Sequence, residues 1–114
     1  MSNELETRCL LFAKSVRQFC RSLKWDTINL QDIKQVVRSS GSIGANYIEA
    51  NENLGVSDLK MHIRISRKEA KETVYWLNLL FVGESNEFDS ARNKLIDEAE
   101  QLKKIFSAIL LKIQ

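Results

Sequence analysis

Residues 30–52 read LQDIKQVVRSSGSIGANYIEANE, and the structure assigned to them decides the fold of the whole chain. The serines and glycines of residues 39–45 disfavour a helix by intrinsic propensity, so a loop is the competing interpretation. Apolar and small residues nevertheless recur in register through this run at spacings of three and four, the period of one helical face. The predicted stripe consists of Leu30, Ile33, Val36, Val37, Ser40, Ile43, Gly44, Tyr47 and Ile48. We therefore predict one continuous helix, with small residues at its centre that let another backbone approach closely.

Three further segments are amphipathic with the same period. The stripe of the first consists of Leu5, Cys9, Phe12, Val16, Phe19, Cys20 and Leu23, and that of the last consists of Leu95, Ala99, Leu102, Phe106, Ile109 and Ile113. The predicted helices cover residues 3–23, 28–53, 57–82 and 88–113. Candidate N-caps are Thr27 or Asn29, Ser57, and Asn86 or Asp89. Gly55 is a suitable C-terminal stop for the second helix.

The length and the scarcity of turn residues support this assignment. The chain has 114 residues, the size of one domain, so we predict a single domain over residues 1–114. It contains no proline and four glycines, whereas an all-β domain needs many turns that draw on both. Short connections between helices of similar length favour antiparallel neighbours. The sequence thus predicts an all-α fold, an antiparallel up-and-down four-helix bundle.

The charge, the cysteines and the hydropathy restrict the class of protein. The net charge of +2 is too mild to indicate nucleic-acid binding by itself. Cys9 and Cys20 fall on the buried face of the first helix, which favours reduced thiols over a disulfide or a metal site. There is no apolar run long enough to cross a membrane and no signal-peptide pattern at the N-terminus. We expect a cytoplasmic protein that has no contact with membranes.

The third predicted helix has two apolar faces. The first, which should point into the core, consists of Leu59, Ile63, Ser66, Ala70, Val74 and Leu77. The second consists of Met61, Ile65, Trp76 and Leu79. A lone bundle needs one apolar face per helix, so the second strip, together with the small residues of the second helix, favours self-association. The alternative is a wide core face with Trp76 under a loop.

The remaining face of this helix is basic. It carries Lys60, Arg64, Arg67, Lys68 and Lys71. Such a row of cations can follow the backbone of RNA or DNA. The alternative is a solvated surface on which Glu69 and Glu72 are local partners of the cations. Tyr75 is the one aromatic residue on the same side.

Glu69 lies between the two apolar faces, so its carboxylate should be partly buried and should need a partner. Donors on the second helix are Arg38, Ser39 and Asn46, while Glu49 lies on the same side as Arg38 and Ser42. We interpret these residues as a polar network that sets the helix register or forms an intersubunit contact. A catalytic carboxylate pair is the alternative.

No catalytic constellation is evident. His62 is the only histidine, so the two Glu-x-x-His motifs of a di-iron bundle are absent, and His62 is better interpreted as structural. Phosphate-loop and dinucleotide motifs are also missing. One histidine and two apolar-face cysteines do not make a nucleophile–base pair. We predict no enzyme, no cofactor, no metal site and no small-molecule substrate.

Two stretches resemble a known family. Residues 37–50, VRSSGSIGANYIEA, carry Arg38, Ser39, Ser42, Ile43, Asn46 and Glu49 at the spacing of its signature. Residues 65–77, ISRKEAKETVYWL, are similar to its third helix. This is the bacterial four-helix-bundle family of 23S rRNA intervening-sequence, or S23, proteins. Ala50 departs from it, since many relatives carry glycine there.

The resemblance implies a bundle that assembles into a ring, commonly a pentamer, without established enzymatic activity. It also implies a link to nucleic acid, because some relatives are encoded within 23S rRNA genes, and a related group binds a reverse transcriptase and nucleic acid through a basic surface. Our leading hypothesis is a homo-oligomer that binds RNA or DNA through the basic face. The alternative is a protein-interaction adaptor, such as an accessory subunit of a reverse-transcriptase-like enzyme, without direct nucleic-acid binding.

Overall fold

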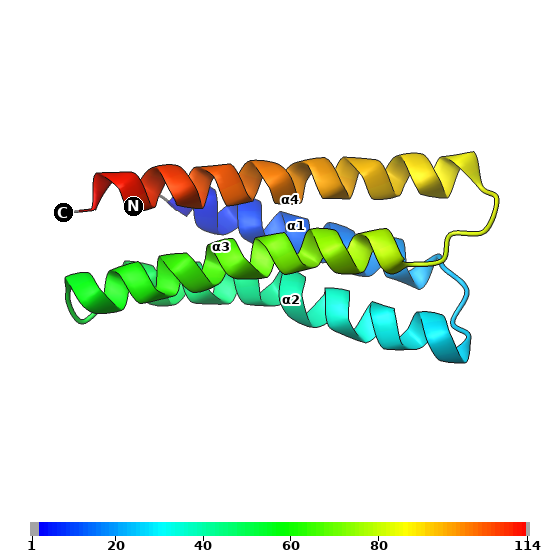
Figure 1. Cartoon of the computed structure of the whole chain (residues 1–114), viewed down its shortest axis with the longest axis horizontal. Coiled ribbons are helices and arrows are strands. Elements are labelled where there is room, and N and C mark those ends of the chain that lie inside the picture. Colours follow the sequence, from blue (N-terminus) through cyan, green and yellow to red (C-terminus); the bar gives the residue numbers. More distant parts are fainter. Residues whose placement is uncertain (1–2, 114) are drawn as a thin grey trace.

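The computed structural model describes residues 3–113 and contains four helices. They are α1 (Asn3–Arg21), α2 (Thr27–Asn51), α3 (Val56–Leu79) and α4 (Asn86–Lys112). Successive helices run in opposite directions, so that the start of α1 and the end of α4 lie at the same end of the molecule (Figure 1). The all-α, antiparallel up-and-down bundle is therefore confirmed. Of the single domain predicted over residues 1–114, Met1, Ser2 and Gln114 lie outside the described residues.

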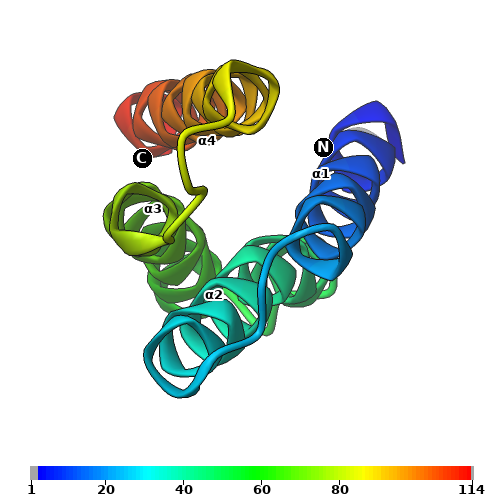
Figure 2. The same cartoon turned by 90° about the vertical axis from the view of Figure 1, so that its right-hand side faces the viewer.

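The four helices do not pack equally. The contact between α2 and α3 is the most extensive and that between α1 and α4 is the least. Seen end-on, α2 lies between α1 and α3, α4 lies over α3, and the bundle is widest on the side where α1 faces α4 (Figure 2). None of the helices within residues 3–113 is long and apolar enough to cross a membrane.

The predicted stripes supply most of the core. All seven stripe residues predicted for the first helix are buried, although Leu23 lies just beyond the end of α1 at Arg21. The three in the middle of the α4 stripe, Ala99, Leu102 and Phe106, are buried as well. In α2 the prediction was wrong at Ile48, whose side chain is half exposed, while Ser39 and Ala50 are fully buried. Ser39 is tolerated there because its hydroxyl lies 2.8 Å from that of Thr73 on α3. Burial of a hydroxyl costs little when it has such a partner.

The serine- and glycine-rich centre of α2 is helical, as predicted. Because its two glycines have no side chain, α1 of the same chain can pack close against α2. A Cβ added at Gly44 would lie 3.0 Å from the Cβ of Cys9, and one at Gly41 would lie 3.2 Å from Nη2 of Arg17. These two positions are therefore occupied by α1 and give no support to an interface with a second copy.

The predicted helix caps were wrong, and the nearest candidates, Thr27, Ser57 and Asn86, lie one or two residues after the actual caps. Asp26 caps α2, with its carboxylate accepting from the Asn29 N–H, and Ser85 caps α4 by accepting from the Phe88 N–H. The N-cap of α3 is Gly55, whose φ of 137° favours glycine, and Ser57 lies inside the helix. Asp26 and Ser85 each precede the first turn of their helix, where the side-chain oxygen reaches a backbone N–H that has no partner within the helix.

Helix α3 ends at Leu79, three residues before the predicted end, because the Asn29 side chain binds the backbone of the connection to α4. The buried Asn29 side chain donates to the carbonyl of Phe81 at 3.2 Å and accepts from its N–H at 2.8 Å. Its amide also donates to the carbonyl of Lys24 at 2.8 Å. One side chain thus ties the α1–α2 connection to the α3–α4 connection.

Candidate functional site

A groove between α3 and α4 gathers the basic residues. It has a volume of about 370 Å³ and is lined by Arg64, Arg67, Lys68, Lys71, Lys103 and Ser107. The spacing of the α3 cations places them on one side of that helix, and Lys60 precedes Arg64 by one turn. Four of the five cations predicted from the sequence therefore line one groove. Lys103 was not among the predicted residues, because nothing in the α4 pattern indicates which helix its basic residues will face.

The α3 cations in and beside this groove are free of partners. Within residues 3–113, none of these five side chains takes part in an ion pair or a hydrogen bond. The local partners expected for them, Glu69 and Glu72, turn instead toward Arg38 of α2. Among the described cations that line the groove, Lys103 of α4 is the one in an ion pair, with its Nζ 3.0 Å from Oε2 of Glu100. The groove therefore presents positive charge that the chain itself does not neutralise.

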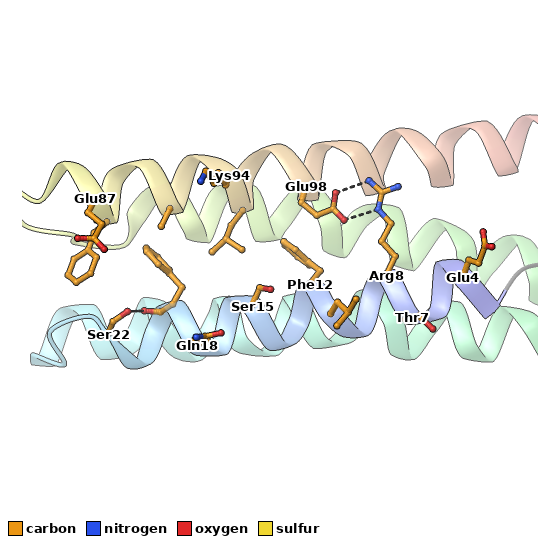
Figure 3. Close-up of a pocket in the computed structure, with 15 residues that line it drawn as sticks. Glu4, Thr7, Arg8, Phe12, Ser15, Gln18, Ser22, Glu87, Lys94 and Glu98 are labelled. Carbon is orange, nitrogen blue, oxygen red and sulfur yellow. Dashed lines mark hydrogen bonds and ion pairs between the residues drawn. The ribbon is translucent and has the colours of Figure 1, made fainter.

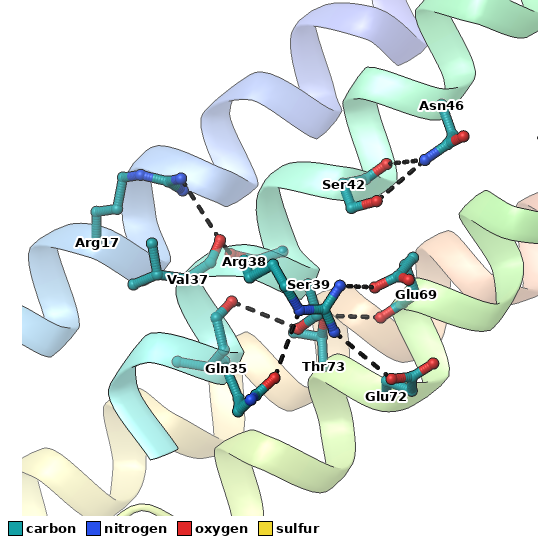
Figure 4. A network of polar contacts seen from close by, with 12 residues as sticks. Arg17, Gln35, Val37, Arg38, Ser39, Ser42, Asn46, Glu69, Glu72 and Thr73 are labelled. Carbon is teal, nitrogen blue, oxygen red and sulfur yellow. Dashed lines mark hydrogen bonds and ion pairs between the residues drawn. The ribbon is translucent and has the colours of Figure 1, made fainter. Parts of the chain in front are cut away.

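Arg38 is the centre of a polar network between α2 and α3 (Figure 4). Its Nη1 lies 3.3 Å from Oε2 of the buried Glu69, and its Nη2 lies 3.6 Å from Oε1 of Glu72. The hydroxyl of Thr73 donates to the carbonyl of Glu69 at 2.8 Å and meets Ser39 on the other side. Both carboxylates face one guanidinium, an arrangement that holds two helices in register. Of the three donors predicted for Glu69, Arg38 is the one that meets it, whereas Ser39 bonds Thr73.

A second polar group lies nearer the α2–α3 connection. The Asn46 amide donates to the hydroxyl and the carbonyl of Ser42, both at 3.0 Å, and its oxygen faces Nδ1 of His62 at 3.2 Å. On its other side His62 faces Asp58, with Nε2 3.4 Å from Oδ1. Glu49 is exposed and its side chain has no bonded partner among the described residues, so it does not join either group. Asn46 was predicted as a donor to Glu69, but in the structure its side chain contacts His62.

The second apolar strip of α3 is interrupted. Met61 is 47% and Leu79 is 46% exposed, whereas Ile65 and Trp76 are half-buried. Lys68 and Glu72 occupy the same side of the helix between these pairs, because they follow at the same spacing of three and four. The four residues therefore form two patches, one toward each end of the helix.

A large open groove lies between α1 and α4, with a volume of about 690 Å³ (Figure 3). The buried rings of Phe12 and Phe19 line it from α1, and Phe88 of α4 packs against Phe19 edge-to-face at 6.5 Å. Arg8 bridges the groove toward one end, with Nε and Nη2 donating to the two carboxylate oxygens of Glu98 at 2.8 and 2.7 Å. This hydrogen bonding raises the pKa of Arg8. This groove was not predicted, since a helical period does not show how far apart two helices stand.

The cysteines are buried, as predicted. Burial raises the pKa of the Cys9 thiol to about 12 and that of the Cys20 thiol to about 11. Both remain protonated near neutral pH and are poor nucleophiles and poor metal ligands. Within residues 3–113, no three histidine, cysteine or carboxylate side chains lie close enough together to hold a metal ion.

Comparisons with known proteins agree with this architecture. Residues 3–108 match the family described as 23S rRNA-intervening sequence protein. The chain is also similar to the crystal structure of a protein of unknown function from the S23 ribosomal protein family of Bacteroides thetaiotaomicron, with a TM-score of 0.77 and 28% sequence identity. That likeness covers 92% of this chain and 96% of the other. No curated protein matches. The chain, a helical bundle with the family's sequence pattern along nearly its whole length, belongs to the 23S rRNA-intervening sequence protein family.

Proposed function

We propose that this protein is a non-enzymatic, cytoplasmic subunit of a homo-oligomer that binds the phosphate backbone of RNA or DNA in the groove between α3 and α4. The observation that carries the proposal is the set of unpaired cations on α3, four of which line that groove. Unpaired lysine and arginine side chains bind phosphates by displacing counterions. The family name supports the proposal, since it relates these proteins to 23S rRNA.

Titration of fluorescently labelled RNA and DNA oligonucleotides, followed by anisotropy at several salt concentrations, tests the proposal. We expect affinity to fall steeply with salt, because each phosphate contact adds about 0.7–0.9 to the slope of log K against log salt. The double substitution Arg64→Glu and Lys68→Glu should abolish binding. The control is Lys14→Glu with Lys34→Glu, which changes the net charge equally on exposed positions of α1 and α2.

The same titrations distinguish nucleic-acid binding from the alternative function, which is that of a protein-interaction adaptor. Lost binding with an intact oligomer supports nucleic-acid recognition by the groove. Absence of binding by the unmodified protein, even at low salt, would overturn the proposal and would favour an adaptor for a partner protein. Binding that survives charge reversal would place the nucleic acid on another surface.

Self-association is the second part of the proposal, and the exposed side chains of Met61 and Leu79 support it. Apolar side chains that gather in surface patches mark sites where another chain docks, and Met61 and Leu79 each belong to one of the two apolar patches of α3. We expect sedimentation at micromolar concentration to show an oligomer, with a five-membered ring favoured. Met61→Glu with Leu79→Glu should give a folded monomer, because neither side chain is buried in the bundle. A monomer without any substitution would refute this part.

A further inference from the structure

We infer that the α3–α4 groove takes single-stranded nucleic acid, and that the ring of Tyr75 stacks on an unpaired base beside the row of cations. This inference rests on the proposed function, because it names the form of nucleic acid that the same groove would accept. RNA and DNA share the necessary chemistry, which is a chain of phosphates that carries flat, unpaired bases.

The position of Tyr75 links it to the basic residues. It follows Lys71 by four residues and Lys68 by seven, so all three side chains lie along the same side of α3. By helical rise, Tyr75 lies about 16 Å beyond Arg64, which leaves room for several nucleotides between them. A strand whose phosphates follow the groove would therefore pass the tyrosine at its end.

The Tyr75 ring is both accessible and supported. Tyr75 is 60% exposed, one of the most exposed aromatic residues in the described chain. Its ring meets that of Trp76 edge-to-face, with 5.1 Å between centroids and 75° between planes. Trp76 is itself half-buried against the core, so it holds the neighbouring ring in place. A ring fixed in this way loses little conformational freedom when a base stacks on it.

The aromatic ring distinguishes single strands from duplexes. The bases of a duplex stack on one another and offer no free face to a side chain, so only the phosphates of a duplex could use this surface. An unpaired base has a free face, and stacking on an aromatic side chain is tolerant of its identity. The combination of a basic row with one supported aromatic ring therefore favours a single strand.

Anisotropy titrations with three probes test the inference. The probes are a single-stranded oligonucleotide of about 12 nucleotides, the duplex of the same sequence, and an abasic strand with the same phosphates. We expect Tyr75→Ala to weaken binding of the single strand by about 5- to 150-fold and to leave the other two probes unchanged. Tyr75→Phe should bind normally, because stacking uses the ring and not the hydroxyl. Parallel RNA and DNA titrations show which sugar is preferred.

The control is Phe81→Ala, which removes a similarly exposed ring, 58% exposed, from the connection after α3. It should leave all three affinities unchanged, and sedimentation should show the same oligomer for both alanine variants. If Tyr75→Ala binds the single strand as tightly as the unmodified protein, the inference is overturned while the proposed function stands. If the unmodified protein binds none of the three probes, the proposed function fails and the inference fails with it.

Discussion

The guanidinium of Arg38 on α2 covers the buried carboxylate of Glu69 on α3, with Nη1 3.3 Å from Oε2. The Glu69 side chain is only 9% exposed, whereas that of Arg38 is 51% exposed. A carboxylate so far from water needs a partner, and Arg38 supplies it from the neighbouring helix. The α2–α3 contact is the most extensive in the bundle, so this pair sits where the two helices must keep their register.

Arg38→Ala should lower the free energy of unfolding by about 1–3 kcal/mol, because it leaves the Glu69 carboxylate buried and unpaired. Glu72→Ala removes the more exposed partner of Arg38 and should change it by less than about 1 kcal/mol. Urea denaturation measures both values. The double variant Arg38→Ala with Glu69→Gln should recover part of the loss, since no buried charge remains. Equal effects of Arg38→Ala and Glu72→Ala would contradict this account of the pair.

The two glycines inside α2 should respond differently to alanine. Gly44→Ala should destabilise the fold by about 1–3 kcal/mol, because the new Cβ would lie 3.0 Å from the Cβ of Cys9, which cannot move without the α1 backbone. Gly41→Ala meets only the flexible end of Arg17 at 3.2 Å. There the gain in helix propensity, about 1 kcal/mol, should offset the contact. Thermal unfolding of the two variants compares them directly, and a Gly44→Ala protein at least as stable as Gly41→Ala would contradict the expected close approach.

Asn29 should be among the most sensitive polar positions. Asn29→Ala removes three hydrogen bonds and leaves the N–H and the carbonyl of Phe81 without their partner. We expect the free energy of unfolding to fall by about 2–3 kcal/mol. Asn29→Asp keeps the shape but turns a donor into an acceptor facing two carbonyls, so it should also destabilise the protein. The control is Asn78→Ala on the exposed surface of α3, where we expect about 0.5 kcal/mol or less. Chemical denaturation of the three variants tests this order.

The buried thiols predict a loss of stability at alkaline pH. Burial raises the pKa of Cys9 to about 12 and of Cys20 to about 11, above the value of 9.0 expected in the unfolded chain. The folded state therefore favours neutral thiols. Their contribution is complete below pH 9 and is lost as the pH rises through 11 and 12.

The measurement compares the unmodified protein with the double variant Cys9→Ala and Cys20→Ala. The difference in free energy of unfolding between them should narrow as the pH rises from about 8 to about 11. At pH 8 a thiol reagent should label both cysteines only after unfolding. Rapid labelling of the native protein would show that these thiols are not buried in solution.

The sequence by itself determined the four helices and most of the core. The stripe from Leu5 to Leu23 is buried at every predicted position, because a helical period depends only on residues a few positions apart. The same reasoning found the helical centre of α2, where the period outweighed the poor propensity of residues 39–45. It also found the basic face of α3, since the cations share one side of a single helix.

Tertiary structure alone decided which side chains meet across helices. Packing places Lys103 of α4 beside the α3 cations and pairs Arg38 with Glu69. It also places His62 beside Asn46, and Asn29 against Phe81, which is 52 residues away in the sequence. It also placed α1 against Gly44 and left the wide groove between α1 and α4. The physical reason is that a period specifies one face of one helix. The rotation and separation of packed helices depend instead on side chains that are distant in the sequence.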